Sequence, residues 1–184
     1  MRPGDGSLNC PDQLCLTIEE YAENALEYFT DRSTFVFLAG NHSLRILLSL
    51  TNTHNVTLTG EASGSYSTIV CESNANIWFL NASHLKLEQL TFDLLFLEQP
   101  AQPTSLLSVV DSVNVKVDSV LFRGNGISRF GAISISKSNV IIENSAFKGN
   151  CRTEGGAISA YQANITLNGN YFVNNRAQTN SVAA

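Results

Sequence analysis

Residues 122–133 read FRGNGISRFGAI and residues 147–158 read FKGNCRTEGGAI, so one pattern returns after 25 residues. Phe172 and Asn175 begin a third copy at the same spacing. A repeat of this length is typical of a solenoid, in which each repeat buries its apolar face only by stacking on its neighbours. The stretch therefore predicts an architecture, and it leaves the function open.

Apolar-x-apolar triplets extend this repeat upstream and supply its expected strands. Each triplet alternates with a period of two, so its first and third residues should point into the core and its middle residue outward. No long helical pattern separates the triplets, which excludes a sheet with helical crossovers. We therefore expect an all-β fold, a right-handed parallel β-helix of about six rungs. The triplets begin at Val56, Leu85, Val115, Val140 and Ile165.

Two residue types recur in columns that should run along the solenoid. Equivalent residues of neighbouring rungs lie about 4.8 Å apart, so each residue packs on its own copy. We expect phenylalanine rings to stack in the core and asparagine amides to hydrogen-bond along the turns, because an amide both donates and accepts. The alternative is that Asn is simply common in turns. The expected columns are Phe92, Phe122, Phe147 and Phe172; Asn55, His84, Asn114, Asn139 and Asn164; and Asn125, Asn150 and Asn175.

These motifs carry a family resemblance. The stretches 147–150 (FKGN) and 155–158 (GGAI) resemble the FxxN and GGAI repeats of the chlamydial polymorphic outer-membrane proteins and of right-handed β-helix domains in extracellular animal proteins, which have a pectin lyase-like fold. Residues 34–44 are similar to the N-terminal part of the animal group. The resemblance covers roughly residues 14 to 175. It implies a surface or extracellular setting, and it implies no catalytic residue.

The N-terminal region predicts a helix that caps the solenoid. Residues 17–20 (TIEE) have capping-box spacing, and apolar residues follow at helical intervals from Ile18 to Phe29. We therefore expect a cap segment over residues 1–30 and a β-helix over residues 31–184, within one domain of a longer polypeptide. The polar start of the chain has no apolar signal segment, so a secreted protein would have lost its leader.

The four cysteines constrain the possible disulfides. Cys71 and Cys151 are expected in turns three rungs apart, roughly 14 Å, which exceeds the Cα reach of about 7 Å for a disulfide. Cys71 should instead pair with the cap, with Cys15 as the first candidate and Cys10 as the alternative. The rival arrangement is a local bridge between Cys10 and Cys15, and Cys151 stays single in either case.

The net charge and the sequons bear on possible partners and on glycosylation. A net charge of −5 argues against a nucleic-acid partner, which would require a basic face. No apolar run approaches the length of a membrane span. Asn-x-Ser/Thr sequons occur at Asn41, Asn55, Asn81 and Asn164. Because Asn55 and Asn164 belong to an expected ladder, we predict Asn41 and Asn81 as the glycosylation sites.

One outward column could carry chemistry, namely Glu88, Asp118 and Glu143. Stacked carboxylates repel one another, and a shared cation such as calcium would hold them together. The alternative is a solvated face, in which Lys86 and Lys116 balance the acids. Glycan cleavage would also need a proton donor or acceptor over the scissile bond, and the columns contain none. We therefore expect no catalytic residue, no cofactor and at most a weak metal site.

The sequence thus favours a non-catalytic extracellular or cell-surface module for structural display, adhesion or ligand interaction, with an unidentified protein or glycan as its partner. Insertions at residues 60–68 and 97–105 would supply specificity. The main alternative is a fragment of a carbohydrate-active β-helix enzyme, either a polysaccharide lyase or a glycoside hydrolase. A bacterial autotransported passenger is a third possibility, and the cysteines and sequons disfavour it.

Overall fold

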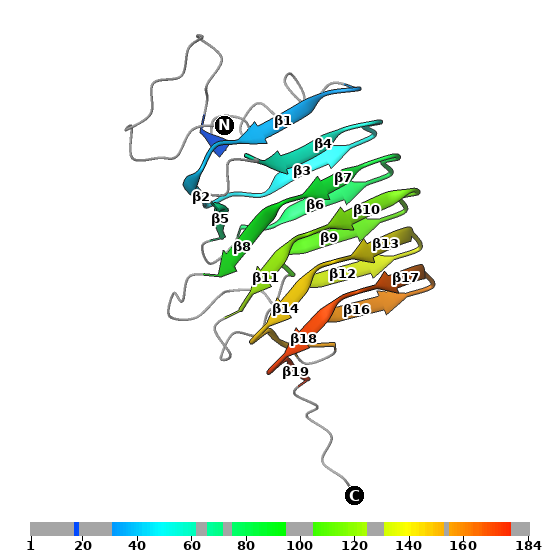
Figure 1. Cartoon of the computed structure of the whole chain (residues 1–184). Helices are drawn as coiled ribbons and strands as arrows, with labels where there is room; N and C mark the ends of the chain where they lie inside the picture. Colours follow the sequence, from blue (N-terminus) through cyan, green and yellow to red (C-terminus); the bar gives the residue numbers. More distant parts are fainter. Residues whose placement is uncertain are drawn as a thin grey trace, which may run out of the picture.

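The structure is a computed structural model that describes residues 17–18, 31–61, 66–71, 75–94, 105–124, 131–152 and 155–177. These residues form an all-β parallel solenoid of about five turns. Figure 1 shows the strands of successive turns stacked along one axis. Six rungs were predicted, and two of the three long sheets have six strands, whereas the third has five.

The three long sheets run along the solenoid, and all their neighbouring strands are parallel. Sheet A contains β1 (Thr34–Phe37), β4 (Thr57–Gly60), β7 (Lys86–Glu88), β10 (Val115–Asp118), β13 (Asn139–Glu143) and β17 (Asn164–Asn168). Sheet B contains β2 (Gly40–Leu44), β5 (Ser67–Cys71), β8 (Leu90–Leu94), β11 (Leu121–Arg123), β14 (Ala146–Lys148) and β18 (Tyr171–Val173). Sheet C contains β3 (Leu48–Thr51), β6 (Ile77–Leu80), β9 (Leu107–Val110), β12 (Ile133–Ser136) and β16 (Ile158–Tyr161). A short parallel pair joins β15 (Cys151–Arg152) to β19 (Arg176–Ala177).

The predicted triplets follow sheet A in the expected register, with Val56 and Leu85 directly before β4 and β7. Val115 pairs with Val140, and Val140 pairs with Ile165 in the next rung. The corner from sheet A to sheet B turns on one left-handed residue in each of four successive rungs, at Gln89, Ser119, Asn144 and Gly169, with φ between 50° and 61°. Because a left-handed residue redirects the chain within one position, each strand is short and ends where the next sheet begins.

The phenylalanine column stacks in the core as expected. Ring centroids lie 5.2 Å apart for Phe92 and Phe122, 5.1 Å for Phe122 and Phe147, and 4.8 Å for Phe147 and Phe172. The planes differ by no more than 10°. The sequence analysis missed the upper end of this column, where buried His42 occupies the equivalent position in β2 and its ring meets Phe37 edge-on at 5.3 Å.

The asparagine columns form hydrogen bonds between rungs. Asn150 Nδ2 donates to Asn175 Oδ1 at 2.9 Å, and Asn164 Nδ2 donates to Asn139 Oδ1 at 3.1 Å. Asn114 Nδ2 lies 3.2 Å from Nε2 of His84. Asn125 lies outside the described residues. The column is not uniform: Asn55, His84 and Asn114 have left-handed backbones, whereas Asn139 and Asn164 are the first residues of their strands. The 25-residue rungs have one turn residue fewer at this corner.

Two sequence predictions concern the N-terminal region, most of which lies outside the described residues. Of the predicted capping helix only Thr17 and Ile18 are described, and Ile18 is buried in the core. The rest of that helix, together with Cys10 and Cys15, lies outside the described range, so the division into cap and solenoid stays a prediction. Within the part of the chain that is described, no helix has the length and apolar character to cross a membrane.

The cysteines differ from the prediction. Cys71 ends β5 and Cys151 begins β15, so neither is a turn residue, and both are buried free thiols. Cys71 lies in register with Leu44 and Leu94 and faces the core, because it is two residues from inward-facing Ile69. The predicted bridge from Cys71 to Cys15 or Cys10 is therefore not formed in this structure. Burial, with a smaller contribution from Asp93, raises the pKa of the Cys71 thiol to about 12.

Candidate functional site

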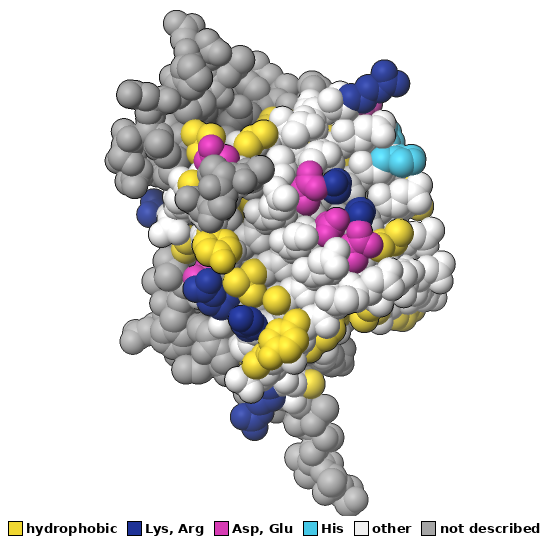
Figure 2. Space-filling view, viewed as in Figure 1, with side chains coloured by type: hydrophobic (Ala, Val, Ile, Leu, Met, Phe, Trp, Pro, Cys, Tyr) yellow, Lys and Arg dark blue, Asp and Glu magenta, His cyan; other side chains and the backbone are white. Residues whose placement is uncertain are grey.

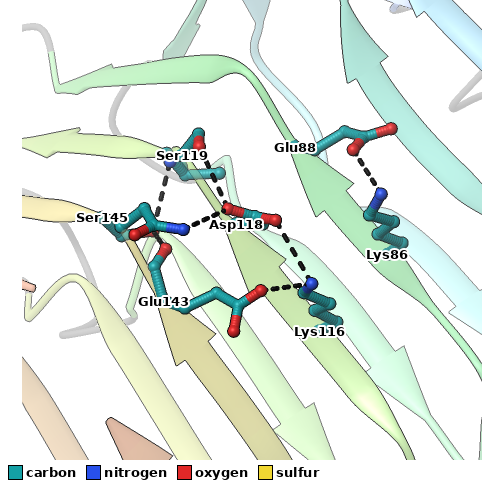
Figure 3. Close-up of polar contacts among 9 residues, drawn as sticks. Lys86, Glu88, Lys116, Asp118, Ser119, Glu143 and Ser145 are labelled. Atoms are coloured by element: carbon teal, nitrogen blue, oxygen red, sulfur yellow. Dashed lines mark hydrogen bonds and ion pairs between the residues drawn. The ribbon is translucent and has the colours of Figure 1, made fainter. Parts of the chain in front are cut away.

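The outward face of sheet A brings together the charged residues singled out in the sequence (Figure 3). We call Lys86, Glu88, Lys116, Asp118 and Glu143 the charged ladder. Strands β7, β10 and β13 supply these residues, with Lys86 beside Lys116 and with Asp118 between Glu88 and Glu143. Alternate residues of a strand share one face, so each lysine projects on the same side as the acid two positions later.

Lysines pair with the three acids of the ladder. Lys86 Nζ contacts Glu88 Oε2 within one strand, whereas Lys116 Nζ contacts Glu143 Oε1 of the next rung and lies 3.3 Å from Asp118 Oδ2. Hydrogen bonds to Glu143 and then Asp118 raise the pKa of Lys116. Figure 2 shows the acidic and basic side chains side by side on this face. Because the ladder is partly solvated, each pair adds little to the free energy of unfolding.

Asp118 is the most constrained acid of the ladder. Asn144 Nδ2 donates to its Oδ1 at 3.1 Å, and Ser119 Oγ donates to the same atom at 3.0 Å. These bonds and Lys116 lower the pKa of the Asp118 carboxyl, the bond from Asn144 contributing most. A carboxyl with a lowered pKa is a poor general acid or base at neutral pH, because catalysis favours a pKa near the working pH.

The structure therefore brings the predicted carboxylates into register but places lysines among them. Among the described residues, no group of three His, Cys, Asp or Glu side chains is arranged to hold a metal ion. A cation shared by Glu88, Asp118 and Glu143 would have to displace Lys116 from Asp118 and Glu143. The column as it stands can join neighbouring rungs electrostatically.

Sequence reasoning missed Asn144 and Ser145 as supports of this face. Asn144 is the left-handed corner residue that follows Glu143, where the next rung has Gly169. Ser145 Oγ donates to the carbonyl of Glu143 at 2.8 Å and accepts from the amide of Val120 at 3.2 Å. An Asn directly after an acidic residue at a predicted corner could have indicated this support, because Asn tolerates left-handed backbone and its amide can donate to a carboxylate.

The sequon asparagines differ in their surroundings. Asn41 is exposed on β2. Asn164 donates to Asn139, as the ladder predicted, but Asn81 also donates its Nδ2 to Asn52 Oδ1 at 2.6 Å. A glycan is attached through this same amide nitrogen and leaves it one N–H, so modification of Asn81 or Asn164 would compete with a bond between rungs.

Comparisons with known proteins add little to this geometry. No family model matches the chain, and no curated protein matches it. Among solved structures, the crystal structure of "a putative glycosyl hydrolase" from Parabacteroides merdae ATCC 43184 aligns with a TM-score of 0.47 at 15% identity, over 84% of this chain and 88% of that one. A likeness at this level says nothing about the activity of this chain.

Proposed function

We propose that this chain is a non-catalytic extracellular or cell-surface module, a right-handed parallel β-helix that displays binding surfaces on a rigid rod. The observation that carries the proposal is the pairing within the charged ladder. Lysines engage its three acids, and Asn144 and Ser119 also hold Asp118 in its anionic form.

This pairing supports a structural role for the ladder. Lys116 joins β10 to β13, and Asn144 of the later rung bonds Asp118 of the earlier one, so both contacts tie successive rungs together. Glycan cleavage would require a carboxyl free to exchange a proton with the substrate. Neither the Asp118 carboxyl nor the Glu143 carboxyl is free in this sense, because each contacts the ammonium group of Lys116.

Separate arguments support the rigidity of the rod and the right-handed coiling of its chain. The continuous ring stack and the bond from Asn150 to Asn175 resist independent movement of the rungs. Crossover connections between parallel strands of one sheet are right-handed in about 98% of cases, which supports the proposed hand. Of the predicted insertions that would vary the displayed surface, at residues 60–68 and 97–105, residues 62–65 and 97–104 lie outside the described residues.

An assay for catalysis tests the first half of the proposal. The purified chain should release neither unsaturated product nor reducing ends from neutral polysaccharides or polyuronates, with or without calcium. The matched variants are Asp118→Ala in the ladder and Asp93→Ala, which lies outside the ladder on sheet B and pairs with Arg123. Turnover by the wild type that disappears only in Asp118→Ala would refute the non-catalytic function.

Secretion tests the second half of the proposal, that the chain acts outside the cell or at its surface. Expressed behind a heterologous signal peptide in eukaryotic cells, the chain should reach the medium folded and carry a glycan at Asn41. Asn41→Gln should remove a glycosidase-sensitive mass shift, whereas Asn164→Gln should not. Intracellular retention of the wild type as misfolded material would contradict an extracellular function.

A further inference from the structure

The outward faces of the three sheets differ in charge. Sheet A carries the charged ladder, and sheet B carries Asp93, Arg123 and Lys148 in one outward column. None of the ten described outward residues in the strands of sheet C is charged. They form two columns, in which Ser108 is buried and the others are half-buried or exposed: Ser49, Trp78, Ser108, Ser134 and Ser159; and Thr51, Leu80, Val110, Ser136 and Tyr161.

Two large aromatic side chains lie on this uncharged face. Trp78 alternates with buried Ile77 and Phe79 and is 38% exposed. Tyr161, in β16, is 63% exposed and lies three rungs further along, roughly 14 Å at the rung spacing. Exposed Trp and Tyr are the side chains most often used as anchors at binding surfaces, since each combines a large apolar ring with a polar group.

Hydroxyl groups lie in the rungs close to Tyr161. Ser134 and Ser136 of β12 and Ser159 of β16 face outward and are half-buried. Each hydroxyl can donate and accept a hydrogen bond, and the rungs repeat this pattern about every 4.8 Å. The strands of this face therefore offer flat rings and paired donors and acceptors but no charge; exposed Asp111 and Lys137 lie at the corner that follows β9 and β12.

This chemistry matches an uncharged carbohydrate. A sugar ring has an apolar face that packs on an aromatic ring and a rim of hydroxyls that bond to serine side chains, and a neutral sugar needs no counter-charge. We propose that the outward face of sheet C binds a linear neutral glycan along the solenoid axis, with Trp78 and Tyr161 as stacking platforms. The inference rests on the proposed display function and names the class of its ligand.

The chain provides its own probe for this face, because Trp78 is its single tryptophan. The full chain is titrated with the neutral hexasaccharides of glucose, mannose and xylose and, as a charged comparator, with hexagalacturonate. Tryptophan emission and calorimetry follow binding. Tyr161→Ala retains the probe, Trp78→Ala is measured by calorimetry, and Tyr171→Ala is the matched control, since Tyr171 is 61% exposed on sheet B.

Saturable binding of at least one neutral hexasaccharide, weakened about tenfold by Tyr161→Ala and by Trp78→Ala but unchanged in Tyr171→Ala, would support the platform. Circular dichroism melts establish that each variant is folded. Three results would overturn the proposal: no neutral binding, a preference for hexagalacturonate, or a dimer in light scattering that Trp78→Ala dissociates. Cleavage of a bound glycan would refute the non-catalytic function and leave the platform, whereas absent binding without cleavage would refute the platform alone.

Discussion

Replacing Phe147 with alanine tests the core column most directly. Phe147 is fully buried, and its ring stacks between Phe122 at 5.1 Å and Phe172 at 4.8 Å. Truncation of a buried Phe removes its transfer free energy and leaves a cavity, which together cost about 3 to 5 kcal/mol. The lost ring pairs, at about 0.5 to 1.5 kcal/mol each beyond area burial, place Phe147→Ala in the upper part of that range.

Phe172→Ala is the matched comparison, because Phe172 has the same chemistry in the last described rung. It is 46% exposed and has one described ring neighbour in the column, so we expect a loss of about 1 to 2 kcal/mol. Phe147→Leu keeps an apolar side chain but removes the ring, so it reduces the contribution of burial less than Phe147→Ala does, with an expected cost of about 1 to 2 kcal/mol.

Urea unfolding followed by far-ultraviolet circular dichroism measures all three variants. Differences in midpoint at an unchanged slope give the change in free energy of unfolding. A loss below about 1 kcal/mol for Phe147→Ala would mean that the residue is outside the core. Equal losses for Phe147→Ala and Phe172→Ala would contradict the register of the column, since the two positions differ so much in exposure.

Three further predictions concern polar groups. Because the pKa of Asp118 is lowered from its ordinary value of 3.8, this residue adds stability above that value, and the stability is lost as pH falls through the lower folded pKa. Asp118→Asn should therefore lose less stability than the wild type in thermal melts between pH 5 and about pH 3; parallel curves would show that Asp118 gains nothing from its partners. Because Cys71 is buried and its pKa is raised, iodoacetamide should not modify it in the native protein at neutral pH but should label it in denaturant. Non-reducing peptide maps should show no disulfide partner for Cys71, and a mapped bridge to Cys15 would support the disulfide predicted from the sequence. Asn175→Ala should cost about 1 to 3 kcal/mol in urea unfolding, because it leaves the backbone N–H of buried Asn150 without its acceptor and removes the bond from Asn175 Nδ2 to the Phe147 carbonyl; Asn175→Asp keeps the acceptor but sets a carboxylate oxygen against that carbonyl, so it should destabilise the fold as well.

Much of the core could be predicted because repetition imposes a strict test on the inward residues. Each inward residue must pack on its own copy, so the same residue types recur at a fixed spacing. This recurrence predicted the register of Phe122, Phe147 and the strand triplets. The upper rungs lack that signal. In β2 the equivalent of the Phe column is His42, and a buried histidine could not be assigned to a core column from letters alone.

The misplacement of Cys71 has a local cause. The sequence analysis assigned Cys71 to a turn, whereas it is the last residue of a strand. In the structure β5 continues to Cys71, so the alternation that buries Ile69 also buries the cysteine. The face of sheet A was only half predictable: the acid column followed from spacing, but the partners of Lys116 depend on side-chain reach across rungs.

A solenoid separates the residues that stabilise it from those that contact a partner. Inward positions are tied to their copies, whereas outward positions of one sheet can differ from those of another at little cost to the core. In this chain the charges of sheet A pair with one another, within a strand and from β10 to β13, and the strands of sheet C present uncharged residues with two exposed aromatic rings. Substitution of Tyr161, which is 63% exposed, should therefore change binding with little effect on the free energy of unfolding, whereas Trp78→Ala, at 38% exposed, should destabilise the fold but less than Phe147→Ala does. A stability loss at Trp78 comparable to that at Phe147 would show that the indole packs as part of the core and would remove the argument for a surface platform.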